Sequence, residues 1–277
     1  MWEKWQASIN ILCALRNDKT VLVDCEHNGP LTVQKVFYPE KTCHMYLLHP
    51  PGGIAGCDEL NVRLEVAPGA KVLLTTPGAT KYYRTQVDLQ AISIQKFWVK
   101  KQSELEILPQ ANIYFTGTNT KVFTEIHLEN GAKLFFRDIS VCGSIAQKAD
   151  FAESYFTNQI SIYRHINNQT SREQLQFHET TRVNGNKDLF SKAVLNGCQC
   201  IGMVLATPAN AEDLLLVRNI LSTEQIIYGA SLLGDILVIR LLSQNNEDLE
   251  NMTVKLWQCL RPTIFGKEPV LPRVWAT

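Results

Sequence analysis

The chain has 277 residues, and its 27 lysines and arginines balance its 27 aspartates and glutamates, so the formal net charge is zero. Without an excess of basic residues to displace counterions, the composition argues against nucleic acid as a partner. No apolar stretch is long enough to span a bilayer, so we expect no membrane partner and take a cytoplasmic location as the default. Hydrophobic residues make up 45% of the chain, which is typical of a globular protein with a sizeable core.

The first two hundred residues carry a β pattern. From Leu60 to Val66 apolar and polar residues alternate, as in a half-buried strand. The unit "LEVAPGAKVLL" (64–74) recurs as "IHLENGAKLFF" (126–136) and, more weakly, as "FWVKKQSELEIL" (97–108). Repeats of about thirty residues are typical of stacked supersecondary units. We therefore predict a mainly β fold whose body, residues 1–200, is a β-solenoid or stacked sheets resembling a β-helix; a two-sheet sandwich is the alternative.

The chain between about residues 164 and 190 is polar and rich in asparagine, which predicts a loop or an exposed hairpin. After residue 200 the pattern changes to β-α-β-α. Ile201–Ala206 and Asp235–Leu242 are the predicted strands, and the two helices are expected to begin at Thr207-Pro208 and Asn245-Asn246. Arg261-Pro262 is expected to end the second helix. Because no polar linker separates residues 201–277 from the body, this small α+β segment should pack on it as one structural unit.

The eight cysteines are expected to be reduced, because disulfide frameworks are typical of short secreted chains. Cys198 and Cys200 form a C-x-C pair that would share one face of a strand, where two thiols can meet a soft metal. The alternative is a pair of small buried apolar side chains. The residues by themselves leave the role of this pair open.

Signatures of catalysis are scarce. The chain lacks a G-x-G-x-x-G fingerprint, a P-loop, H-E-x-x-H and G-x-S-x-G, so we do not expect an enzyme. Glu65, Asp88, Glu104 and Glu106 lie on or beside predicted strands, where a charge usually marks the solvated face. A β-solenoid hydrolase or lyase acting on a polysaccharide remains the alternative from another class, and a generic adaptor without a metal role is the third.

The stretch "HPPGGIAGCDEL" (49–60) combines a stiff arm with a sharp corner. Proline holds the chain extended, and Gly52-Gly53 can adopt backbone angles that other residues avoid. This corner should bring His49, Cys57 and Asp58 to one end of the strand that follows. A second corner at residues 75–85 presents a basic, aromatic edge, which is either turn surface or a partner contact.

These segments resemble a known family. The run "HPPGGIAGCDEL…V…GAKVLLTTPGATKYYRT", the segment "LEILPQANIYFTG" (105–117) and the end "LRPTIFGKEPVLPRVWAT" (260–277) are similar, in the same order, to the urease accessory protein D/H family (UreD, called UreH in some organisms). The resemblance covers most of the chain from about residue 37, while residues 142–200 depart from the family pattern.

The resemblance implies a non-catalytic protein of urease maturation, a chaperone for nickel insertion. It implies a β-rich scaffold and nickel conduit that links the F accessory protein and the G accessory protein, a nickel-carrying GTPase, to apo-urease. No tightly bound cofactor is implied, and Ni²⁺ would be transient. The assembly would be heteromeric, with a dimer of heterotrimers as one arrangement.

A conduit must bind weakly, because a full set of imidazole, thiolate and carboxylate ligands would trap nickel. Scattered single ligands are therefore the candidates, and Asp58 matches the family motif best. The predicted nickel-transit residues are His49, Cys57, Asp58, Thr85, Asp138, His178 and Glu179, and the predicted partner-binding residues are Lys81, Tyr82, Tyr83, Arg84, Arg273 and Trp275.

Overall fold

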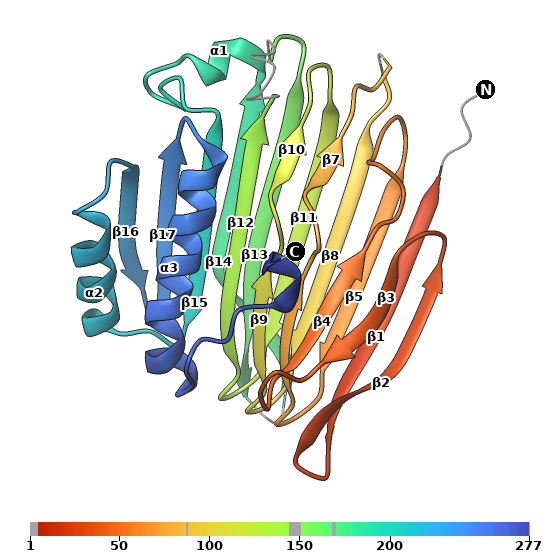
Figure 1. Ribbon diagram of the computed structural model, residues 1–277, viewed down its shortest axis with the longest axis vertical. Helices are drawn as coiled ribbons and strands as arrows, with labels where there is room; N and C mark the ends of the chain where they lie inside the picture. Colours follow the sequence, from red (N-terminus) through yellow and green to blue (C-terminus); the bar gives the residue numbers. More distant parts are fainter. Residues whose placement is uncertain (1–4, 87, 144–150, 168–169, 277) are drawn as a thin grey trace.

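The computed structural model describes residues 5–86, 88–143, 151–167 and 170–276, and most of them lie in two stacked β-sheets (Figure 1). The first sheet has seven strands in the order β14-β13-β11-β8-β5-β1-β2. Its strands are β1 (Gln6–Arg16), β2 (Lys19–Asn28), β5 (Glu59–Val66), β8 (Ala91–Val99), β11 (Asn119–Leu128), β13 (Tyr155–Asn167) and β14 (Thr170–Asn184).

The second sheet has ten strands, eight of them in the order β16-β17-β15-β12-β9-β6-β4-β3, while β10 pairs with β12 and β7. Its strands are β3 (Thr32–Phe37), β4 (Cys43–Leu48), β6 (Lys71–Thr75), β7 (Thr80–Tyr82), β9 (Glu104–Leu108), β10 (Asn112–Tyr114), β12 (Lys133–Cys142), β15 (Cys200–Thr207), β16 (Ile227–Leu233) and β17 (Ile236–Ser243).

The chain winds between the two sheets as a solenoid. Strands β1, β5, β8, β11 and β13 run parallel in the first sheet, and β4, β6, β9 and β12 run parallel in the second. Antiparallel strands cover both ends of this parallel stack, β2 and β3 at one end and β14 and β15 at the other. The predicted β-solenoid-like body is therefore confirmed.

The repeated corner explains why the coils stack. Gly69, Gln102 and Gly131 occupy equivalent corners and all have positive φ, at 71°, 55° and 71°. The amide of Gly69 donates to the carbonyl of Lys101, and the amide of Gln102 donates to that of Asn130, so each corner sits on the next. Glycine adopts this conformation at little cost, whereas Gln102 adopts it with strain.

Two helices, α2 (Ala211–Leu221) and α3 (Asn246–Phe265), cover the outer face of the second sheet near its β16 end (Figure 1). The expected start of α2 at Thr207-Pro208 is wrong: Asn210 caps the helix, accepting from the amides of Glu212 and Asp213, while Thr207 ends β15. Asn245 caps α3 as predicted. None of the described helices combines the length and apolar composition that a bilayer crossing needs.

The expected end of α3 at Arg261-Pro262 is also wrong. The helix continues to Phe265 and ends at Gly266, whose φ of 66° is the left-handed C-cap conformation. Ile264 and Phe265 are buried in the core between helices and sheet, and this burial favours the additional turn. The polar stretch around residues 164–190 forms the β13–β14 hairpin and the short helix α1 (Gly185–Leu189), and the chain closes with a 3₁₀ turn at Arg273–Ala276.

Glu104 and Glu106 do not lie on a solvated face, contrary to the expectation from sequence. Helix α3 covers this part of β9, and Glu106 accepts bonds from Trp257 Nε1 at 2.6 Å and from Arg261 Nε and a second guanidinium nitrogen at 2.9 and 3.0 Å. Glu104 pairs with Lys267. These buried ion pairs fasten the C-terminal segment to the solenoid.

Candidate functional site

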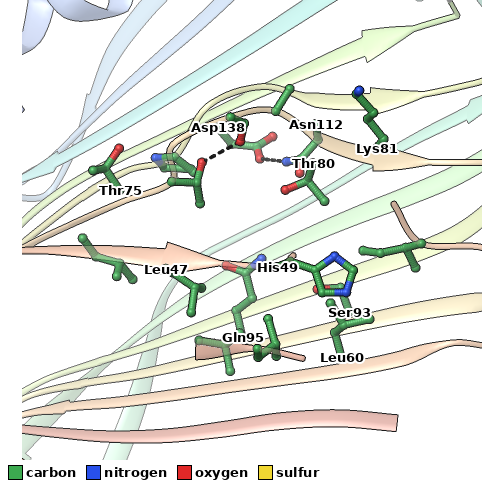
Figure 2. A pocket seen from close by; sticks show the side chains of 18 of the residues that line it. Leu47, His49, Leu60, Thr75, Thr80, Lys81, Ser93, Gln95, Asn112 and Asp138 are labelled. Carbon is green, nitrogen blue, oxygen red and sulfur yellow. Dashed lines mark hydrogen bonds between the residues drawn. The ribbon is translucent and has the colours of Figure 1, made fainter. Parts of the chain in front are cut away.

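A cavity of about 260 Å³ lies between the two sheets, with walls from β5, β8 and β11 on one side and β6, β7, β10 and β12 on the other (Figure 2). Because side chains alternate along a strand, every second residue of these strands points into this space. Most inward positions along the solenoid are apolar and fill the core, whereas here several are polar. The polar side chains that line the cavity include Thr75, Thr80, Ser93, Gln95, Asn112 and Thr124.

Asp138, an inward residue of β12, is the main charge of this interior, and it is 9% exposed. Its carboxylate accepts from Asn112 Nδ2 at 2.9 Å, Asn158 Nδ2 at 2.7 Å and Ser140 Oγ at 3.3 Å. Burial raises the pKa of Asp138 to about 6, and the three hydrogen bonds oppose that rise. At neutral pH the group is therefore an anion held in place by neutral donors.

A second cavity, of about 530 Å³, lies between the β13–β14 hairpin and strands β15 to β17, and Asp138 lines it as well. Glu179 of β14 and Arg240 of β17 also line this cavity. Their ion pair crosses from the first sheet to the second, with Arg240 Nε donating to both carboxylate oxygens at 3.1 and 2.9 Å. Asp138 thus lines both cavities, and the second one reaches the surface, where the side chain of Arg240 is 47% exposed.

The arm at residues 50–53 forms one wall of the first cavity. The expectation that Gly52 and Gly53 supply unusual backbone angles is wrong, since neither has a positive φ, and Gly53 has a different role. Its role is close approach: a Cβ atom there would lie 2.3 Å from the ring of Tyr83 and 2.8 Å from the carbonyl oxygen of Lys81. The amide of Ile54 donates to the carbonyl of Lys81 in β7, and the amide of Tyr83 donates to the carbonyl of Ile54, so the residue that follows the arm is held beside β7.

The structure brings three of the predicted nickel-transit residues to the cavities, namely His49 at the first, Asp138 at both and Glu179 at the second. His49 follows the end of β4, in the same sheet as Asp138, and in the close view it lies apart from that carboxylate (Figure 2). Burial lowers the pKa of His49, and the charge of Asp58 opposes this shift. A neutral imidazole can act as a ligand or as a hydrogen-bond partner.

The other four lie elsewhere. Asp58 accepts from the amide of Ala55 at 3.0 Å, so its carboxylate stabilises the turn before β5. Cys57, in the same turn, is half-buried and does not line the cavities described above. Thr85 bonds to the carbonyl of Gly117 at the next corner, and His178 is exposed on the outer face of the first sheet, beside Ser161 at 2.9 Å.

The predicted partner-binding residues divide in the same way. Tyr82 is 1% exposed and stacks on Tyr114, so the expected exposed edge does not include its ring. Trp275 packs on the body, donating to Thr75 Oγ1 at 3.1 Å and stacking with buried Arg137. Surface access remains at Lys81, Tyr83, Arg84 and Arg273, of which Tyr83 stacks on Phe115 and Arg84 packs against Gly117.

The C-x-C pair does not form a ligand cluster with other residues. Cys200 is buried beneath the helices and Cys198 precedes β15, and burial raises the pKa of both thiols. No cluster of three or more His, Cys, Asp or Glu side chains suited to a metal occurs among the described residues. The polar residues that sequence reasoning missed, above all Asn112 and Asn158, are separated from Asp138 by 26 and 20 positions, and only the register of the strands joins them.

Fold and interior together define a class: a β-solenoid protein with two cavities along its interior, whose largely apolar walls carry polar groups around a buried carboxylate. The family model for UreD urease accessory proteins matches residues 6–276. Relatives named urease accessory protein UreD are similar over 99% of this chain: 38% identical in Klebsiella pneumoniae subsp. pneumoniae, covering 96% of that protein, and 36% identical in Enterobacter sp. (strain 638), covering 96%. One from Pseudomonas putida (strain GB-1) is 36% identical, covering 95%. The chain belongs to the UreD urease accessory protein family.

Proposed function

We propose that this chain is a non-catalytic scaffold of urease maturation and a conduit that passes nickel from the F and G accessory proteins to apo-urease. Family membership supports the maturation role, because the relatives are named urease accessory proteins. The observation that carries the conduit is the position of Asp138, which lines both interior cavities. Asp138 is buried, whereas the other charged residues of the lining, Lys81, Arg182, Glu179 and Arg240, are exposed or partly exposed, so the buried part of this space favours a cation.

The interior also supports weak binding rather than storage. The cavity walls offer scattered hydroxyl and amide groups, and the carboxylates of Asp138 and Glu179 already have protein partners. A site that releases its ion readily is what a conduit requires. The polysaccharide enzyme gains no support from the described residues, since both carboxylates are engaged by hydrogen bonds within the protein.

The test is Asp138→Asn, which keeps the size of the side chain and removes its charge. We expect the variant to form the complex with the F and G proteins and apo-urease, and to reduce nickel-dependent urease activation by about tenfold or more, as loss of a partly buried charge would produce. Asp24→Asn, an exposed aspartate of β2, is the matched control and should activate normally.

Two other outcomes would change the proposal. Full activation with Asp138→Asn would remove the conduit past Asp138. Complex formation without any activation, in the wild type as well, would leave a generic adaptor. Thermal unfolding of each variant, measured beside the activation assay, separates loss of the charge from loss of the fold.

A further inference from the structure

The walls of both cavities are mostly apolar, and their polar groups are mainly hydroxyl, amide and carboxylate groups rather than soft ligands. No cysteine occurs among the described residues that line them. The sulfur-containing side chain among these residues is Met203, a thioether in the second cavity. The histidine among the described lining residues is His49, in the first cavity. Nickel selects imidazole and thiolate over hydroxyl and amide groups when it binds a protein directly. The lining therefore suits an ion that keeps its own water ligands.

Hydrogen bonding at Asp138 leads to the same conclusion. A carboxylate has about four lone-pair positions, and three of them are used by Asn112, Asn158 and Ser140. Direct coordination of a metal would have only the one remaining lone pair, or would have to displace one of these donors. A water molecule bound to a metal, in contrast, needs a single acceptor, and the cation makes that water a stronger donor.

A free acceptor is available next to Asp138. Asn158 is 6% exposed, and its Oδ1 has no hydrogen-bond partner among the described residues although its Nδ2 donates to Asp138. Buried polar atoms are rarely left unpaired, and those that are require an explanation. Asn158 lines the second cavity, so a donor located there, such as a metal-bound water, would complete its hydrogen bonding.

The cavities are also large enough. Six waters at ~30 Å³ each occupy about 180 Å³, which is less than the roughly 260 and 530 Å³ of the two cavities. The positive charge of Arg240, which lines the second cavity, is offset by its ion pair with Glu179. Lys81 in the first cavity and Arg182 in the second are exposed to solvent, which screens their charge. A divalent ion with its complete hydration shell therefore fits these cavities in size and in charge.

We propose that nickel crosses this chain as its hydrated ion, held through its bound waters by Asp138 and Asn158, with no protein atom in its first coordination shell. This inference rests on the proposed conduit function. It implies that the chain does not distinguish nickel from other hydrated divalent ions. Selection of the metal must then take place before the ion enters.

The test uses cobalt(III) hexammine, whose ligands do not exchange, so that it can bind only through their N–H groups. The probe is added to the full-length chain in complex with the F protein, without nucleotide, and the cobalt-59 NMR line width is measured. We expect broadening that Ni²⁺ reverses by competition. Asp138→Asn should weaken binding of the probe by about tenfold or more, and Asp24→Asn should leave it unchanged.

The results separate this inference from the conduit itself. Absence of competition between the probe and Ni²⁺, combined with activation that still depends on Asp138, would overturn passage of the hydrated ion and leave the conduit in place. Equal binding of the probe to wild type and Asp138→Asn would overturn the inference as well. Normal urease activation by Asp138→Asn would instead overturn the conduit.

Discussion

The buried ion pair between Glu106 and Arg261 should be a main determinant of stability. Their side chains are 1% and 0% exposed, so solvent screens them little. Replacing Glu106 by Leu removes the two-point bond to Arg261 and the acceptor of Trp257 Nε1. Breaking one partner of a buried pair costs about 3–5 kcal/mol, and an unpaired indole N–H adds about 1 kcal/mol. We expect the free energy of unfolding to fall by about 4–6 kcal/mol, which urea denaturation followed by circular dichroism measures.

A double variant tests the reasoning behind this value. In Glu106→Leu with Arg261→Met the buried guanidinium is removed as well, and Glu40, its other partner, keeps His44 at 3.2 Å. We expect at least half of the lost stability to return. Burial lowers the pKa of Arg261 and Glu106 and Glu40 raise it; in the single variant Glu40 remains, and a guanidinium stays charged in proteins. A loss below about 1 kcal/mol in the single variant, or a double variant as unstable as the single one, would refute the argument.

Three further predictions concern the corner, the arm and the interior carboxylate. Gln102→Gly relieves strain at a φ of 55° and should raise the unfolding free energy by about 0.5–1 kcal/mol. Gly53→Ala places a Cβ atom 2.3 Å from the ring of Tyr83 and should lower the unfolding free energy by about 1–3 kcal/mol. Burial raises the pKa of Asp138 to about 6, so the folded state favours the protonated carboxyl more than the unfolded state does. The unfolding free energy should therefore fall by about 2–3 kcal/mol as the pH rises from 4 through 6. Asp138→Asn should lose this dependence, as urea unfolding at pH 4 and pH 7.5 would measure.

Each of these has a matched control. Gln102→Ala keeps the strained conformation and should gain nothing; an equal gain would show that strain is not the cause. At Gly52 an added Cβ atom meets nothing within 4 Å, so Gly52→Ala should be close to neutral, and a cost equal to that of Gly53→Ala would contradict the close-approach argument. For Asp138, the same pH dependence in wild type and Asp138→Asn would assign the titration to another group.

Local patterns predicted the solenoid because its corners repeat in the sequence. The stacked turns at residues 69, 102 and 131 and the alternation from Leu60 to Val66 are both local signals, and the structure contains both features. The strand Ile227–Leu233 was missed because its sequence, "IYGASLL", has no clear alternation of polar and apolar residues and pairs with β17 at the edge of the sheet. The boundary of α3 was misjudged because tertiary burial outweighs the tendency of proline to end a helix.

The candidate site was predicted only in part, because it depends on which strands become neighbours. His49, Asp138 and Glu179 were predicted as charged or ligating residues and line the cavities. Asn112 and Asn158 carry no signal by themselves, since a neutral amide becomes notable only beside a buried carboxylate. Glu106 was interpreted as solvated because its partner Arg261 lies 155 positions away.

The most direct test of the central claim is a nickel soak of crystals of this chain in its complex, with anomalous diffraction recorded at the nickel edge. A path through the solenoid predicts a peak between the two sheets, beside Asp138 and separated from its oxygens by a layer of water. Nickel found only on the outer surface, with an interior free of anomalous density at saturating metal, would contradict it.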